Sequence, residues 1–478
     1  MNRRIICRVL GMILLCLAAL MILPTIAGLW YGENVSHFII TMVLTGAVGF
    51  AMTRVKPYSS VIYAKDGFVI VGLGWILMSL FGALPFVISG DIPNYIDAVF
   101  ETVSGFTTTG ASILENVEEM SQGCLFWRSF THWIGGMGVL VFIMAVLPMS
   151  GEHSMHIMRA EVPGPTVGKL VPRVRQTAKI LYLIYVVMTA IEVVLLLFGG
   201  MSLFDALIHS FGSAGTGGFS NKAASVGAYN SAYIEMVIAV FMALFAINFN
   251  LFFLLLIGRW KEALKSEELH WYLAIIAASV LAITLGIRDS YGSVLTALRH
   301  AFFNVSSITS TTGFCTVDYV QWPEYCRWIL VILMFCGACA GSTGGGLKTS
   351  RVVMVFKNIT CEIRQMIHPR TITRVQMDGK RVDEAGMKAV NTFFACFMLL
   401  LVLGTFLVSL DNHDLSTNFT AVLSCLSNIG PGMSLVGPTG NFNIFSYGSK
   451  IVLTFAMLIG RLEIYPILIL FAPSTWKR

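Results

Sequence analysis

The chain has 478 residues, of which 56% are hydrophobic and only 12% are charged, and its mean hydropathy is +0.76. A soluble domain is typically about a quarter charged, so the composition excludes a soluble globular protein and indicates several membrane spans. The formal net charge of +6 says little about nucleic acid, because the basic residues lie between apolar segments rather than in one run, and no nucleic acid partner is predicted.

The ten cysteines are scattered, mostly inside apolar segments, and lack the paired spacing of a secreted disulfide framework. Cys336 and Cys339 form a CxxC pair, but no strand and no second ligand pair accompanies it. A lone CxxC is a weak signal, so no resident metal or redox site is predicted.

The first apolar segment runs from Ile5 to Leu23 behind Asn2-Arg3-Arg4. It is longer than the apolar region of about 7–15 residues in a signal peptide, and it reaches Pro24 without an A-x-A-like cleavage site. We therefore expect a retained first transmembrane helix.

Ten segments approach the length of about 20 mostly apolar residues that a membrane span requires. In chain order they cover residues 5–30, 37–54, 68–89, 124–149, 177–198, 231–258, 270–287, 324–356, 387–409 and 446–472.

Four shorter amphipathic segments lie between the third and fourth, fifth and sixth, seventh and eighth, and ninth and tenth of these spans. Each is too short to cross a bilayer and ends in a polar tract centred on a glycine. These four glycine tracts are Thr107-Thr108-Thr109-Gly110-Ala111-Ser112, Gly215-Thr216-Gly217-Gly218-Phe219-Ser220, Ser310-Thr311-Thr312-Gly313-Phe314-Cys315 and Ser427-Asn428-Ile429-Gly430-Pro431-Gly432.

The pattern predicts an all-α integral membrane protein with two leading helices and four helix–half-helix–tract–helix repeats. Irregular backbone at membrane depth is tolerated only where it is buried in protein or lines a water-filled cavity, so the repeats are expected to surround one pore with pseudo-fourfold symmetry. The predicted boundaries are 1–60 for the leading helices and 61–165, 166–265, 266–375 and 376–478 for the repeats.

Counting back from the central glycines supports the repeat. Six residues upstream stand small residues only, as close helix packing in membranes prefers, and two upstream stand three hydroxyls and one amide. The residues six positions upstream are Ser104, Gly212, Ser307 and Ser424, and those two upstream are Thr108, Thr216, Thr311 and Asn428. Twelve positions upstream stand Ala98, Ala206, Ala301 and Asn418. The symmetry is only approximate, because at another offset the four equivalent residues are unlike one another: Glu101, His209, Asn304 and Ala421.

Membrane sidedness follows from Lys and Arg, which are enriched in cytoplasmic connections. With the N-terminus inside, most of the 32 basic residues lie on the cytoplasmic side, and the longest inside connection, 348–388, is expected to dock a soluble partner. Both termini are then cytoplasmic and the four glycine tracts lie toward the outer face. The outside carries Arg128, Lys222, Arg288, Arg299, Arg327 and Lys450.

The tracts have the chemistry of a filter for a monovalent cation. Backbone carbonyls can replace the water shell of such an ion without a fixed negative charge, and glycine permits the backbone angles that this requires. Each preceding half-helix would point its negative C-terminal end at the pore. No Asp or Glu lies in any tract, which argues against a divalent-cation filter built on carboxylates.

The eighth span contains the glycine-rich stretch from Gly337 to Gly346. Each glycine costs a helix about 1 kcal/mol relative to alanine, so the helix is expected to break near mid-membrane and form a flexible loop under the third tract. A phosphate-binding loop is the alternative interpretation, but Lys348 does not directly follow the second glycine and no βα unit surrounds it.

Arg461 is a charge inside the last span, which is expensive unless it faces the interior. One interpretation is a structural ion pair with Glu463 or Glu192; the other is an electrostatic barrier in the pore. We favour the barrier. In this interpretation Arg461 closes the pore together with the loop residues Gly341, Ser342, Thr343, Gly344, Gly345 and Gly346.

Three further polar residues inside spans are Asn248, Asn250 and His132. Membrane helices commonly use such side chains for interhelical hydrogen bonds, and this role is expected rather than ion ligation.

The tracts resemble those of the Trk/Ktr/HKT superfamily of potassium transporters, the TrkH type most closely, over the whole chain. The two leading helices are similar to that type, whereas Ktr subunits begin with the repeats. The resemblance implies that each tract supplies a quarter of a K⁺ filter, and Gly110 stands where Na⁺-preferring relatives have serine. The implied ligands are Thr108, Thr109 and Gly110; Thr216, Gly217 and Gly218; Thr311, Thr312 and Gly313; Asn428, Ile429 and Gly430.

The same resemblance implies that the 341–346 loop and Arg461 form the gate of a K⁺ uptake protein in the bacterial inner membrane. It also implies a homodimer controlled by a cytosolic nucleotide-binding ring of the Trk-A (RCK) type. K⁺ is then the transported ion, and no organic cofactor is expected in this chain.

Two other functions stay open at this point. The chain could be the K⁺-translocating subunit of an ATP-driven pump, which would require an ATPase partner. It could also be a membrane-embedded enzyme, although no HExxH, GxSxG or carboxylate cluster lies in the spans. The sequence leaves undecided whether transport is passive or coupled to H⁺ or Na⁺.

Overall fold

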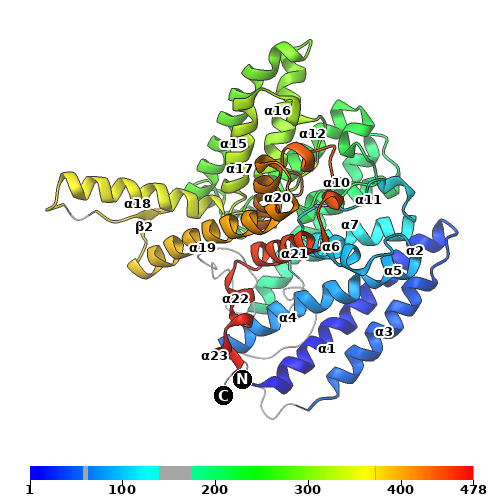
Figure 1. The fold of residues 1–478 in the computed structure, drawn as a ribbon. Coiled ribbons are helices and arrows are strands. Elements are labelled where there is room, and N and C mark those ends of the chain that lie inside the picture. Colours follow the sequence, from blue (N-terminus) through cyan, green and yellow to red (C-terminus); the bar gives the residue numbers. More distant parts are fainter. Residues whose placement is uncertain (57–62, 139–173, 372, 477–478) are drawn as a thin grey trace.

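The computed structural model describes residues 1–56, 63–138, 174–371 and 373–476, and these are mostly helical. The leading part consists of three helices beside the repeats, drawn in blue in Figure 1. They are α1 (Arg3–Leu20), α2 (Ile22–Trp30) and α3 (Ser36–Thr53). Only Met21 separates α1 from α2, so the pair forms the single first span that was predicted.

Four half-helices lie at the centre of the fold, and each is preceded and followed by longer or paired helices (Figure 1). The half-helices are α6 (Tyr95–Phe106), α11 (Leu203–Gly215), α16 (Val294–Thr309) and α20 (Leu415–Ser427). The helices before them are α4 (Ala64–Gly82) with α5 (Leu84–Ser89), α10 (Val174–Phe198), α15 (Glu267–Ile287) and α19 (Glu384–Val408). Those after them are α7 (Gln122–Gly136), α12 (Ala232–Phe245) with α13 (Phe249–Leu256), α17 (Glu324–Cys336) with α18 (Thr349–Ile367), and α21 (Tyr447–Arg461) with α22 (Tyr465–Phe471). The predicted architecture is confirmed.

Local sequence explains where the half-helices begin. Each starts behind a residue whose side-chain oxygen accepts a hydrogen bond from a free backbone N–H of the first turn, the usual helix N-cap. The four caps are Asn94, Ser202, Ser293 and Asp414.

The remaining elements are short and lie in the connections. A hairpin of β1 (Gln376–Met377) and β2 (Lys380–Arg381) follows α18. The others are α14 (Trp260–Ala263), α23 (Pro473–Trp476) and the 3₁₀ turns η1 (Val117–Glu119), η2 (Ser225–Tyr229), η3 (Arg288–Ser290), η4 (Tyr319–Gln321), η5 (Ser409–Asp411), η6 (Ser434–Val436) and η7 (Phe442–Ile444).

Six stretches of the described residues are long and apolar enough to cross a membrane as continuous helix. They are Arg3–Trp30, Ser36–Thr53, Lys65–Ser89, Ala178–Phe198, Glu267–Ser290 and Glu384–Asp411. The predicted span 124–149 can be followed only through α7, because residues 139–149 lie outside the described ranges.

Two predictions of continuous spans were wrong. In place of 231–258, α12 and α13 meet at a bend of 93°, because Asn248 caps α13 and the carbonyl of Ala246 accepts a hydrogen bond from Cys339 N. In place of 446–472, α21 ends at Arg461, and the left-handed Glu463 and Ile464 (φ 54° and 68°) turn the chain into α22. The break predicted in 324–356 is present between α17 and α18.

The outer helices carry the apolar surface expected of a lipid-facing layer. Val43 of α3, Leu183 of α10 and Val402 of α19 are all more than 60% exposed, whereas most of the half-helix side chains are buried. The N- and C-terminal ends lie side by side (Figure 1), where Arg3 donates a hydrogen bond to Trp476 O at 3.4 Å.

Candidate functional site

The four glycine tracts meet in one closed ring. The central glycine of each tract packs against the carbonyl oxygen of the residue that precedes the glycine of the next tract. A Cβ atom added to the glycine would lie only 2.0–2.7 Å from that oxygen, and the fourth tract returns to the first: Gly110 faces Gly217, Gly218 faces Thr312, Gly313 faces Ile429, and Gly430 faces Thr109. Each central glycine therefore meets a backbone carbonyl of the next tract.

Each half-helix ends in the same hydrogen-bonded cap. The N–H of the residue before the glycine bonds to the carbonyl five residues earlier, as in a Schellman motif. The four donor–acceptor pairs, at 2.8–3.0 Å, are Thr109–Ser104, Gly217–Gly212, Thr312–Ser307 and Ile429–Ser424. The approximate fourfold symmetry thus extends to individual backbone bonds.

The residue two before each glycine is left-handed although none is itself a glycine. Its φ is 54–61°, and that of the central glycine is 74–102°, at Thr108 and Gly110, Thr216 and Gly218, Thr311 and Gly313, and Asn428 and Gly430. Alternating handedness turns successive peptide groups in the same direction. A β-branched residue in this region is a genuine outlier, and strain of this kind gathers at functional sites. The sequence marked these positions by their polar side chains, not by their backbone.

Side chains support the ring from behind. Ser424 Oγ donates to Gly430 O at 2.7 Å, and Ser307 Oγ donates to Phe314 O at 2.6 Å. Asn428 Nδ2 donates to Thr109 Oγ1 at 3.0 Å and to Met457 O at 2.9 Å. The two Asn428 bonds fix the fourth tract to the first tract and to α21.

A cavity of about 190 Å³ opens onto the ring. All four central glycines line it, together with Arg128 of α7 and charged residues of the surrounding loops that include Glu115 and Lys222. The guanidinium of Arg128 lies 2.6 Å from Glu101 and 3.5 Å above the Phe219 ring, and it donates to Ser220 O at 3.1 Å. Its charge is balanced by a carboxylate and is held in place at the ring's mouth.

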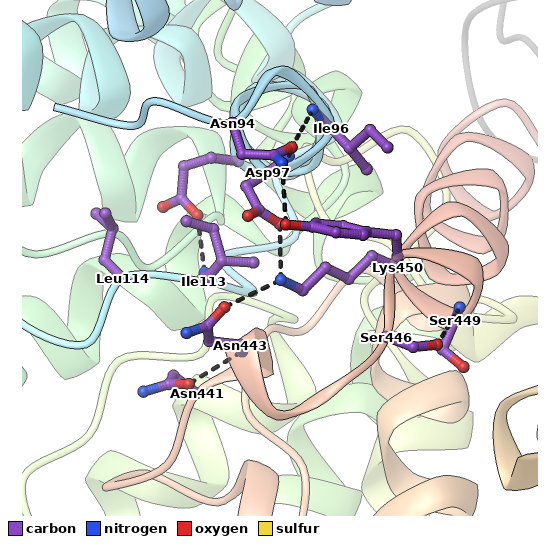
Figure 2. A network of polar contacts seen from close by, with 12 residues as sticks. Asn94, Ile96, Asp97, Ile113, Leu114, Asn441, Asn443, Ser446, Ser449 and Lys450 are labelled. Atoms are coloured by element: carbon purple, nitrogen blue, oxygen red, sulfur yellow. Dashed lines mark hydrogen bonds and ion pairs between the residues drawn. The ribbon is translucent and has the colours of Figure 1, made fainter. Parts of the chain in front are cut away.

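A second buried ion pair joins the first and fourth repeats near this mouth (Figure 2). Lys450 Nζ of α21 donates to Asp97 at 2.7 Å and to Asn443 Oδ1 at 3.0 Å. Asn443 in turn donates to Glu115 at 2.8 Å. The lysine side chain is 4% exposed and that of Asp97 14%. Because no chain connection joins the fourth repeat back to the first, this buried pair links the two.

The glycine-rich stretch between α17 and α18 is a loop packed directly against two tracts. Gly345 N donates to Thr311 Oγ1 at 2.7 Å, and a Cβ on Gly345 would lie 2.4 Å from Ser427 O. Thr343 Oγ1 donates to Phe245 O at 3.1 Å, and Lys348 Nζ donates to Gly344 O. The structure therefore places Gly344 and Gly345 against the half-helix ends of the third and fourth repeats, whereas Gly341 and Thr343 contact the bend between α12 and α13.

The side chain of Arg461 binds the backbone of this loop. Its guanidinium donates to Thr343 O at 2.6 Å and, on the other side, to Gly135 O and Gly136 O of α7 at 2.6 and 2.7 Å. Of the carboxylates considered as its partner, Glu463 pairs with Arg351 at 2.7 Å. The oxygens of Glu192 have no hydrogen-bond partner among the described residues. The loop and Arg461, predicted to act together, are in direct contact.

The other polar residues differ in their roles. His132 joins two repeats as predicted: its Nδ1 lies 2.7 Å from Gly105 O, and its Nε2 accepts from Phe219 N at 3.3 Å. The prediction for Asn248 was wrong, since its side chain caps α13 by accepting from Asn250 N at 2.9 Å. Asn250 contributes its backbone N–H to that cap. The cap was missed because the surrounding apolar run hid the helix end.

The fold and the ring define a helical membrane protein of four repeats around one centre, and its full-length relatives are potassium uptake transporters rather than enzymes. The family model described as "TrkH: Cation transport protein" matches residues 32–274 and 271–478. The chain belongs to this TrkH family.

Individual relatives match over their full length. The Trk system potassium uptake protein TrkH of Salmonella typhimurium is 35% identical over 488 residues, covering all of both chains. The Trk system potassium uptake protein TrkG of Escherichia coli is 33% identical and covers 99% of both. The crystal structure of the potassium transporter TrkH from Vibrio parahaemolyticus superposes with a TM-score of 0.90 at 32% identity, covering all of both chains.

Proposed function

We propose that this chain carries K⁺ across the membrane through the ring of glycine tracts, as the membrane-embedded unit of a potassium uptake system. The observation that carries the proposal is the closed cycle in which each central glycine contacts a carbonyl of the next tract. The oxygens at these contacts belong to neutral backbone carbonyls, and such oxygens replace the hydration of a monovalent cation without trapping it. The full-length relatives are named as potassium uptake proteins, which agrees with this ion.

The filter then consists of three residues from each tract. Left-handed residues at the first and third of these positions direct carbonyls toward the axis, and the half-helix C-termini add their partial negative charge. The proposed ligands are the twelve residues Thr108 to Gly110, Thr216 to Gly218, Thr311 to Gly313, and Asn428 to Gly430. The division into leading helices and repeats at residues 60, 165, 265 and 375 is part of the same proposal.

The gate is the loop Gly341–Gly346 together with Arg461. The loop packs on the half-helix ends that carry the third and fourth tracts, and the guanidinium holds Thr343 O at 2.6 Å. A fixed positive charge at this depth raises the energy of a cation in the pore. Opening requires the loop to leave this position.

The surroundings follow from the same pattern. We place the protein in the bacterial inner membrane with both termini cytoplasmic and the ring's mouth outward, because Lys and Arg gather in the opposite connections. It is proposed to work as a homodimer beneath which a cytosolic nucleotide-binding ring of the Trk-A (RCK) type docks.

Uptake of Rb⁺ or K⁺ into proteoliposomes, measured against Na⁺, tests this function. Purified protein is expected to pass K⁺ and Rb⁺ well above Na⁺ without an ATPase. Equal permeation of Na⁺ and K⁺ would overturn the filter. Flux that appears only with an ATPase partner would favour the pump subunit instead.

A further inference from the structure

Two neighbouring glutamates in the first turn of α15 hold two separate parts of the protein. Ser266 caps this turn by accepting from Leu269 N. Glu268 is buried, with 7% of its surface exposed, and Glu267 is partly exposed. Neither belongs to a tract or to the proposed gate, so the proposed function gives them no role.

Glu268 fastens both ends of the glycine-rich loop. Its Oε1 accepts a hydrogen bond from Ala340 N at 2.7 Å and another from Ser350 N at 3.0 Å. These residues lie immediately before and a few residues after the 341–346 segment. Bonds from backbone N–H groups to a carboxylate are roughly twice as strong as neutral ones. One carboxylate oxygen therefore closes the base of the loop.

Backbone bonds at the base of the loop reinforce this closure. Thr349 N donates to Ala338 O at 3.0 Å, and Thr349 Oγ1 donates to Gly337 O at 3.1 Å. These bonds are internal to the α17–α18 connection. Glu268 differs because it belongs to another helix, so a movement of α15 changes the restraint on the loop.

Glu267 binds the hairpin that lies outside the spans. Its carboxylate pairs with Lys357 of α18 and accepts from Asp378 N at 3.3 Å. Asp378 Oδ1 accepts from Glu267 N at 2.7 Å, and Lys357 Nζ donates to Gln376 O at 2.7 Å. The hairpin β1–β2 is thus tied to the same helical turn that holds the loop.

We propose that Glu268 is a positioning residue that keeps the loop closed, and that the first turn of α15 transmits displacement of the β1–β2 hairpin to the loop. This inference rests on the proposed gate. Adjacent residues of one helical turn move together, so a partner that pulls the hairpin through Glu267 also shifts Glu268. The turn supplies the physical connection that coupling between separate sites requires.

The test compares Glu268→Ala and Glu268→Gln with the matched control Glu262→Gln. Glu262 is an exposed glutamate of the same region that pairs with Arg259 on the surface. Hydrogen exchange of the amides in 337–350 and Rb⁺ uptake into proteoliposomes are measured without any partner protein. Glu268→Ala is expected to speed amide exchange and uptake by about tenfold, since it removes two bonds to a charged acceptor. The Gln variant should show a smaller increase and the control none.

A double variant tests the transmission. Lys357→Met alone should speed exchange in the loop, because it loosens Glu267 from α18, but it should add nothing in the Glu268→Ala background. Additive effects would overturn the connection through the turn. Glu268→Gln keeps the shape of the side chain and provides the measurement if the alanine variant does not fold.

The outcomes separate this inference from the gate on which it rests. Unchanged loop exchange in both Glu268 variants overturns the fastening. Faster exchange with unchanged uptake overturns the role of Glu268 in opening. In that case an increase in uptake by Arg461→Ala would leave the proposed gate standing, whereas no increase there would refute the gate as well.

Discussion

Replacing Gly110 with serine perturbs the ring at one defined contact. The added Cβ would lie 2.0 Å from Gly217 O, whereas real Cβ contacts essentially never fall below 3.0 Å. One of the two groups must therefore move by about 1 Å. In a rigidly positioned site a displacement of about 1 Å is worth roughly 10²-fold in rate. The backbone of Gly110 is also left-handed, with φ 81°, which costs a residue with a side chain about 1–2 kcal/mol.

Gly90 provides a control that separates these two costs. Its φ is 85°, close to that of Gly110, but a Cβ added there meets nothing within 4 Å. Gly90→Ser should therefore lose the same backbone energy without displacing a carbonyl. We expect both variants to unfold more easily in detergent, and only Gly110→Ser to change the ratio of K⁺ to Na⁺ uptake.

The assay is Rb⁺ uptake into proteoliposomes with Na⁺ as competitor, together with thermal unfolding of each purified variant. Gly110→Ser is expected to lower K⁺ preference by at least about tenfold, because the moved oxygen is one of the proposed ligands. If Gly110→Ser kept the wild-type K⁺ to Na⁺ ratio, or if Gly90→Ser altered it equally, the carbonyl ring would not be the filter.

Three further predictions concern the gate, an ion pair and a helix cap. Arg461→Ala should raise uptake about tenfold, which corresponds to a barrier lowered by roughly 1.4 kcal/mol, while Arg461→Lys should raise it less; unchanged uptake in the alanine variant would remove the barrier role. Lys450→Met leaves Asp97 buried without its cation and should lower the unfolding free energy by about 3 kcal/mol, seen as a lower thermal midpoint that a second substitution, Asp97→Asn, partly restores. Thr216→Gly should raise the midpoint by relieving a left-handed threonine worth about 1 kcal/mol, whereas Thr311→Gly also removes the hydroxyl that binds Gly345 N and should show no net gain.

The sequence predicts the repeats and the tract positions because their signals are local. A half-helix too short to span, followed by a glycine, can be read without knowing its neighbours. The break between α17 and α18 is equally local, since the many glycines weaken the helix by themselves. The turn after Arg461 was overlooked, although Pro466 is a signal for it, because proline is well suited to the first turn of a new helix such as α22.

The features that sequence reasoning missed are set by distant contacts. Threonine disfavours left-handed backbone, so nothing local at Thr216 or Thr311 predicts it; closure of the ring by the neighbouring tract overrides the preference. The bend before α13 depends on Cys339 N bonding to Ala246 O, two residues far apart in sequence. The pairing of Glu268 with the loop likewise needs the folded arrangement.

The proposed filter and gate are in direct contact, which limits how independently they can act. Thr311 belongs to the third tract, and its hydroxyl accepts the Gly345 N–H of the loop. Asn428 belongs to the fourth tract, and its Cβ would lie 3.0 Å from a Cβ added to Gly345. Both are the left-handed residues that end their half-helices. When the loop departs, the cap at Thr311 loses a hydrogen bond and the cap at Asn428 loses a packing surface. The caps at Thr108 and Thr216 have no such contact with the loop among those given above and keep their neighbours. Opening is therefore expected to loosen one half of the ring more than the other, so that the conducting filter is less symmetric than the closed one.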